Sequence, residues 1–190
     1  MSPLPTEARN ECLYLARKAL HEFLRRQQEP RLYQPVHPVL REPRGAFVTL
    51  KRHGELRGCI GYVEAIKPLW ETIEDCAISA ASRDPRFEPV AAEELADLDI
   101  EISVLTPLED LPDPAGVEVG RHGILIEKGY HRGLLLPQVA TEYGWNREQF
   151  LAHTCLKAGL PMDAWRHGAK IKVFSADVFG EEEPGRSGPR

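Results

Sequence analysis

The feature that most constrains the fold of this chain is two pairs of short apolar segments. In each pair a glycine-containing turn separates the two segments. Residues 45–51 and 55–61 have the pattern of two strands that meet at Gly54, and residues 123–127 and 132–136 form a second such pair. Glycine accepts the positive φ that tight hairpin turns require. We therefore predict two β-hairpins and a largely antiparallel sheet.

Three helices are predicted among these hairpins. Residues 7–28 carry apolar or small side chains at helical spacing, and a second helix follows Pro68. A third begins after Asn146, a good N-cap, and ends at Gly159. Hairpins interspersed among helices favour an α+β fold, mainly antiparallel sheet with packed helices, over the strand–helix alternation of a Rossmann fold.

Length and charge limit the broad class of the protein. The 190 residues suit one domain, which we place at residues 1–180, and the acidic, Gly- and Pro-containing segment 181–190 is predicted to be a disordered tail. A net charge of −5 does not indicate nucleic-acid binding. No segment approaches the roughly 18 apolar residues of a membrane helix, and the start of the chain has no apolar signal region, so we expect a cytoplasmic protein.

The four cysteines are widely and irregularly spaced and include no C-x-x-C pair. Neither a disulfide framework nor a metal site is therefore predicted. The ordinary interpretation of a free cysteine is a small buried hydrophobic residue, and Cys76 fits it because it lies on the apolar face of the second helix. The sequence identifies no cofactor.

The segment Leu-Arg-Gly-Cys-Ile-Gly at residues 56–61 carries the least usual chemistry. Strand alternation places Arg57 and Cys59 on one face, where a guanidinium would favour the thiolate. Gly58 and Gly61 would let a ligand or another backbone approach closely. The alternative is that the glycines serve tight packing or a bulge and that Cys59 is an inert core residue.

This hexapeptide resembles the signature of the AMMECR domain family. Further segments are similar to family blocks in the same order, and together they cover residues 45–179: Gly45-Ala46-Phe47-Val48, Asp84-Pro85-Arg86-Phe87, Ile102-Ser103-Val104-Leu105, Gly120, His122-Gly123, Leu136-Pro137-Gln138-Val139 and Lys157-Ala158-Gly159-Leu160. The resemblance implies an α+β fold with two subdomains and a cleft between them. It implies no established reaction.

Within that family the chain is similar to the prokaryotic type, protein A of the AmmeMemoRadiSam grouping. This likeness implies two partners, a Memo-type protein and a radical-SAM protein. The radical chemistry would belong to the partner, because this chain lacks the clustered cysteines that hold an iron–sulfur cluster.

Four further residues are candidates for a site around Cys59. Glu101 and Ser103 share the polar face of a strand at residues 99–105, where they could orient a substrate or move a proton, or simply face solvent. His122 could act as a base or be a structural turn histidine. Arg86 could bind an anion, although pairing with Asp84 or capping a helix is the interpretation we favour.

Two classes of function follow. In the first, the chain is an enzyme or enzyme subunit that uses Cys59 in the interlobe cleft as a nucleophile or covalent carrier. Arg57 would activate the thiol there, and His122 or Glu101 would serve as the base. In the second, the chain is a noncatalytic module that binds a partner protein or a small ligand.

Overall fold

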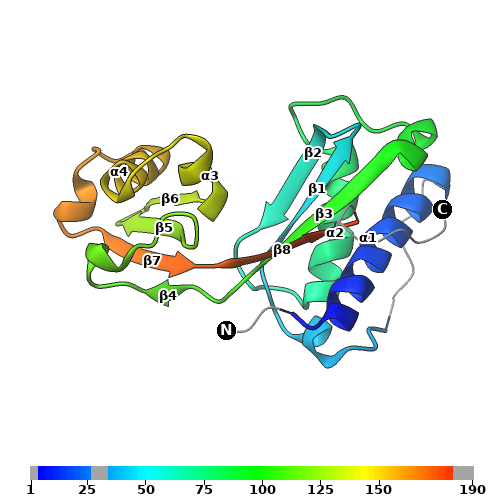
Figure 1. Ribbon diagram of the computed structural model, residues 1–190, viewed down its shortest axis with the longest axis horizontal. Helices are drawn as coiled ribbons and strands as arrows, with labels where there is room; N and C mark the ends of the chain where they lie inside the picture. The colour runs from blue at the N-terminus through cyan, green and yellow to red at the C-terminus, as the bar shows by residue number, and fades with distance from the viewer. Residues whose placement is uncertain (1–3, 27–33, 182–190) are drawn as a thin grey trace. The chain divides into compact units, whose positions relative to one another are not determined.

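The computed structural model describes residues 4–26 and 34–181 (Figure 1). The tail expected at 181–190 therefore lies outside the described residues except for Glu181. The chain divides into two compact units. Unit 1 contains the described residues up to Leu105 together with those from Asp177 onward, and unit 2 is Thr106–Ala176.

The sheet of unit 1 has the strand order β2-β1-β3-β8. Its strands are β1 (Ala46–Arg52), β2 (Glu55–Tyr62), β3 (Leu98–Leu105) and β8 (Ala176–Gly180). β1 pairs antiparallel with both β2 and β3. The predicted first hairpin is confirmed, and its two turn residues have the expected positive φ, 53° at His53 and 81° at Gly54.

Helices α1 (Thr6–Arg26) and α2 (Leu69–Ser82) pack together against this sheet (Figure 1). Because side chains alternate along a strand, one face of the sheet supplies the apolar residues that meet the helices. They are Ala46, Val48, Leu50, Ile100, Ile102 and Val104, all of them buried. Cys76 of α2 is also fully buried, as predicted. The opposite face carries the polar residues of the same strands.

Short helical turns join these elements. They are η1 (Pro38–Arg41) and η2 (Ala92–Asp97). η2 belongs to the segment that leads from the end of α2 to β3, and this segment contacts strand β2 through the hydrogen bonds described below. Leu40 and Leu95 anchor the two turns in the core of unit 1.

Unit 2 contains the second sheet, with the strand order β4-β7-β5-β6. The strands are β4 (Glu109–Asp110), β5 (Gly123–Lys128), β6 (His131–Leu135) and β7 (Lys170–Phe174). All three neighbouring pairs are antiparallel. The second predicted hairpin is therefore confirmed, and β5 extends one residue beyond the predicted strand, to Lys128.

The helices of unit 2 are α3 (Pro137–Glu142) and α4 (Arg147–Lys157), and the short turns η3 (Pro114–Gly116) and η4 (Ala164–Arg166) complete the unit. Asn146 caps α4, as the sequence predicts, and it exchanges hydrogen bonds with Gln149. Gly159 follows the helix with a φ of 72°. Helix α4 buries Phe150, Leu151 and Cys155 in the core of this unit.

The α+β fold with antiparallel sheets is thus confirmed. Strand β4 was not predicted because two residues are too few for an alternating pattern, and β8 was not predicted because its apolar residues Val178 and Phe179 are adjacent. No described helix is both long enough and apolar enough to cross a membrane.

Candidate functional site

Strand β2 lies at one edge of the sheet of unit 1, and a β-bulge interrupts it at Arg57. Lys51 pairs with Leu56, whereas Leu50 pairs with Gly58, so Arg57 is an extra residue on β2. A bulge redirects the side chain of the inserted residue. The expectation that Arg57 lies beside Cys59 assumed uninterrupted alternation, and the bulge removes that basis.

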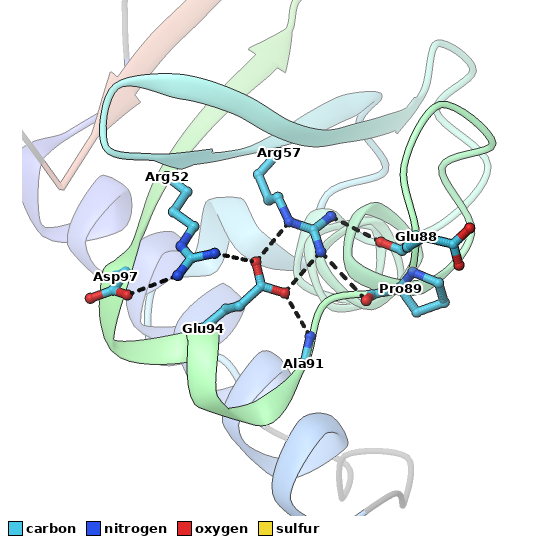
Figure 2. Close-up of polar contacts among 7 residues, drawn as sticks. All are labelled: Arg52, Arg57, Glu88, Pro89, Ala91, Glu94 and Asp97. Atoms are coloured by element: carbon cyan, nitrogen blue, oxygen red, sulfur yellow. Dashed lines mark hydrogen bonds and ion pairs between the residues drawn. The ribbon is translucent and has the colours of Figure 1, made fainter.

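The guanidinium of Arg57 is held by the segment that follows α2 (Figure 2). Its Nε donates to Oε2 of Glu94 and its Nη2 to Oε1, both at 2.9 Å. It also donates to the main-chain carbonyls of Glu88 at 2.9 Å and Pro89 at 3.4 Å. Through these hydrogen bonds Arg57 links the edge strand β2 to the segment that follows α2.

Glu94 is the centre of this cluster (Figure 2). Besides Arg57, it accepts the main-chain N–H of Ala91 at 2.9 Å and the Nη1 of Arg52 at 3.2 Å. These hydrogen bonds, those from Arg57 above all, lower the pKa of Glu94 to about 2. Arg57 in turn has a raised pKa because of its bonds to Glu94. The cluster is a structural ion-pair network on the edge of the sheet.

Cys59 lies on the face of the sheet opposite to the helices, and it is partly exposed. Thr49 is its cross-strand partner on β1, and the Thr49 hydroxyl donates to the Cys59 sulfur at 3.2 Å. The next strand places Glu101 opposite Thr49, so Cys59, Thr49 and Glu101 form one row across three strands. The structure therefore places Glu101 in the same row as Cys59, with Thr49 between them, and a role of Glu101 as a base stays a prediction.

The other three cysteines differ from Cys59 in exposure. Cys12, Cys76 and Cys155 are fully buried. Burial raises the pKa of Cys12 and of Cys76 to about 12, and it also raises the pKa of Cys155. All four cysteines lie in the described part of the chain, and Cys59 is the only one of them that reaches the surface.

The main chain of Cys59 is held by one ion pair. Its N–H donates to Oδ2 of Asp84 at 2.8 Å, and its carbonyl accepts from Nη2 of Arg86 at 3.4 Å. Both groups thus point away from β1, which makes Cys59 and Thr49 a non-hydrogen-bonded pair, the type that brings cross-strand side chains closest. Asp84 and Arg86 satisfy a sheet edge that would otherwise be open.

Asp84 and Arg86 also bind each other, as favoured from the sequence. Arg86 donates through Nε and Nη2 to the two Asp84 oxygens at 2.9 and 2.7 Å. The Asp84 side chain is only 2% exposed, and its bonds with Arg86 hold its pKa well below the ordinary range. The pKa of Arg86 is raised chiefly by Asp84 and in smaller part by negative charge on Cys59. Arg86 is thus the cation that contacts Cys59, through the main-chain carbonyl.

Glu101 and Ser103 occupy different settings on the polar face. Oε2 of Glu101 accepts from Nζ of Lys51 at 2.8 Å, and both side chains are 35% exposed. Ser103 is buried, and its partner on β1 is Phe47. Glu101 thus remains accessible on the Cys59 row, whereas Ser103 lies in the next row.

The two glycines of the hexapeptide have packing roles. A Cβ at Gly58 would lie 2.2 Å from the carbonyl oxygen of Ala80, so α2 can approach β2 only at a glycine. A Cβ at Gly61 would lie 2.3 Å from the ring of Phe47, which crosses over from β1. Tight packing, one of the two alternatives from the sequence, accounts for both residues, and a ligand-binding role for them stays a prediction.

His122 belongs to unit 2, where its Nδ1 accepts the main-chain N–H of Glu118 at 3.2 Å. This bond closes the turn before β5, and the role of His122 as a base stays a prediction. Residues 4–26 and 34–181 contain no group of three or more His, Cys, Asp or Glu side chains that could hold a metal ion.

Sequence reasoning missed three residues of this site: Thr49, Asp84 as the partner of Cys59, and Glu94. Thr49 could not be aligned with Cys59 because a regular two-residue hairpin pairs it with Gly58, and the bulge shifts this register. The partners Asp84 and Glu94 are 25 and 37 residues from Cys59 and Arg57 along the chain. No local pattern indicates contacts at such separation.

Comparison with known proteins gives a consistent match. The AMMECR1 family model matches residues 13–179. A protein of Methanothermobacter thermautotrophicus is 47% identical over 188 residues, covering 95% of this chain and 98% of its own length. Protein MJ0810 of Methanocaldococcus jannaschii is 52% identical over 155 residues, 77% of each chain. The crystal structure of the uncharacterized protein PH0010 from Pyrococcus horikoshii aligns with a TM-score of 0.81 at 45% identity, covering 91% of both chains.

Proposed function

This chain belongs to the AMMECR1 family, and we propose that it acts through Cys59, as an enzyme or enzyme subunit that uses this thiol as a nucleophile or covalent carrier. The observation that carries the proposal is the setting of the sulfur. It is the partly exposed thiol of the chain, it accepts a hydrogen bond from Thr49, and its main chain is fixed by Asp84 and Arg86. A held thiol beside hydrogen-bond donors and a cation is the usual arrangement of a reactive cysteine.

The proposed step is attack on an electrophilic carbon. A sulfur–carbon bond forms while the bond from that carbon to its leaving group breaks, and the leaving group departs with the electron pair. The thiol proton passes to a base, for which Glu101 is the candidate because it shares the row with Cys59 and Thr49. In this proposal Arg86 has the activating role that was predicted for Arg57 from the sequence.

A second candidate is a noncatalytic module that binds a partner protein or a small ligand on the same face. It is favoured by the finding that Arg57, Gly58 and Gly61 all have structural roles. In this case residues 56–61 would stabilise the edge of the sheet and form a binding surface, and no reaction at Cys59 would be required.

Two variants separate these functions in a strain that lacks the gene. Cys59→Ala removes the nucleophile and preserves the surface, whereas Thr49→Arg keeps the thiol and blocks the face with a bulky cation. A catalytic role predicts that Cys59→Ala fails to complement although it unfolds at the wild-type temperature. If Cys59→Ala complements fully while Thr49→Arg fails, the site binds and does not react. Complementation by both would overturn both functions at this face.

The family likeness also supports a proposal about partners, a Memo-type protein and a radical-SAM protein. Co-purification of the tagged full chain with each partner tests it, and Thr49→Arg reports whether the Cys59 face takes part. Failure of both partners to co-purify with the wild-type chain would contradict this proposal and leave the role of Cys59 open to the complementation test.

A further inference from the structure

A hollow of about 390 Å³ lies at one end of the sheet of unit 2, and we call it the β5–β6 hollow. The turn between β5 and β6 forms one wall, and Gly168 and Lys170 at the start of β7 form another. The two walls are joined, because Nζ of Lys128 donates to the carbonyl oxygen of His167 at 2.8 Å. A volume of this size is within the range of small-molecule sites, roughly 300 to 1,000 Å³.

The lining of the hollow is predominantly basic. Lys128, Arg132 and Lys170 line it, and Glu127 is the only acid among the described residues that do so. The two oxygens of Glu127 are already engaged, by Nε of Arg132 at 3.1 Å and by Nζ of Lys172 at 3.4 Å. The hollow therefore has an excess of positive charge in a chain whose net charge is −5.

Lys170 is the cation most available to a ligand. It is exposed at the start of β7, and the described part of the chain offers it no ion pair. Its cross-strand neighbour on β5 is Glu127, whose carboxylate is shared by Arg132 and Lys172 instead. Within unit 2 Lys170 thus remains outside the ion pairs that Glu127 forms.

His131 adds a polar group of fixed orientation. Its Nδ1 lies 3.2 Å from the carbonyl oxygen of Ala158, so this nitrogen carries the proton and donates to that carbonyl. With the proton on Nδ1, the neutral ring presents Nε2 as a hydrogen-bond acceptor. A ring held in this way loses little conformational freedom on binding.

We propose that the β5–β6 hollow binds the phosphate group of a small anionic molecule. Lys170, Lys128 and Arg132 supply positive charge from three strands, and arginine and lysine are the side chains that proteins use for phosphate. The hollow is larger than one phosphate group, which leaves room for part of the molecule that carries it. All residues of the hollow belong to unit 2, whereas the Cys59 row belongs to unit 1.

The test is calorimetric titration of the full chain with pyrophosphate at low ionic strength, with citrate as a second probe. Lys170→Gln removes the unpaired cation of the hollow, and Lys157→Gln removes an exposed lysine of unit 2 that does not line it. We expect saturable binding of one pyrophosphate, weakened roughly three- to tenfold by Lys170→Gln and unchanged by Lys157→Gln. Glu127→Gln should tighten binding, because it removes the one acid from the lining.

Three results would overturn the proposal. The first is no saturable binding of pyrophosphate to the wild-type chain. The second is an equal loss of affinity in Lys170→Gln and Lys157→Gln, which would reduce the effect to general charge. The third is tighter binding of citrate than of pyrophosphate, which would assign the hollow to polycarboxylates.

Discussion

The main-chain N–H of Cys59 donates to the carboxylate of Asp84, a residue 25 positions later in the chain, at 2.8 Å. The same carboxylate binds Arg86, which reaches back to the Cys59 carbonyl at 3.4 Å. One ion pair thus satisfies both main-chain groups of the candidate nucleophile. Because Cys59 sits on an edge strand, these groups would otherwise depend on solvent.

Asp84→Asn should destabilise the protein by about 1 to 3 kcal/mol at neutral pH, since it weakens a buried acceptor of several hydrogen bonds. The folded-state pKa of Asp84 lies below its ordinary value of 3.8, so its stabilising contribution is present above that pH. The contribution is lost as the pH falls toward the folded-state pKa. Urea unfolding at pH 7 and at pH 3 measures this, and a difference between variant and wild type that grows on acidification would contradict it.

Arg86→Gln should slow alkylation of Cys59 by roughly two- to fivefold at low ionic strength, because it removes the cation that contacts the Cys59 main chain. Added salt should reduce the difference. Arg83→Gln is the matched control, since it removes an exposed arginine from the same segment. Equal rates in the wild type and Arg86→Gln, with both folded by circular dichroism, would remove Arg86 from the site.

Arg57→Gln should behave differently, with a loss of stability and no change in Cys59 alkylation. The Arg57–Glu94 pair is largely buried, with side chains 18% and 13% exposed, and we expect a loss of about 1 to 3 kcal/mol. The pKa of Glu94 is lowered from 4.5 to about 2, so this stabilisation is lost as the pH falls through that interval. Slower alkylation in Arg57→Gln than in Arg86→Gln would restore Arg57 as the activating residue.

The roles of Arg57 and Arg86 depend on a bulge and on long-range contacts, and these were harder to predict from the sequence than local structure. Local signals were reliable: Gly54 in its turn, Asn146 and Gln149 at a helix start, and the alternation that put Glu101 on the polar face. The bulge at Arg57 was not predictable, because a single inserted residue leaves no periodic signal. Contacts such as Cys59 with Asp84 depend on the tertiary path of the segment after α2.

Glu74→Gln should raise stability at pH 8 and have little effect below pH 5. The Glu74 side chain on α2 is buried, with 7% exposure, and its Oε1 has no hydrogen-bond partner. Burial raises the pKa of Glu74 from 4.5 to about 7. The positive charge of Lys18 opposes this shift, and the negative charges of Asp75, Glu22 and Glu71 add to it. The folded state therefore holds a proton that the unfolded state has released between these values, and stability from this group is lost as the pH rises from 4.5 through 7.

Denaturant unfolding of the wild type and Glu74→Gln at pH 5 and pH 8 measures this effect. Glu71→Gln, on the same helix, serves as a control for removal of a negative charge. A Glu74→Gln variant that is less stable than the wild type at pH 8 would show that the carboxylate has a stabilising partner.

Competitive alkylation of the native protein tests most directly whether Cys59 is the reactive thiol of this chain. The full chain is treated with a limiting amount of isotopically light iodoacetamide across pH 6 to 9. It is then unfolded and labelled with the heavy reagent, and the light-to-heavy ratio of each cysteine peptide is measured by mass spectrometry. We predict that Cys59 reacts first throughout this range, because burial raises the pKa of Cys12 and Cys76 to about 12 and also raises that of Cys155. Labelling of any of these three cysteines before Cys59 would contradict the account.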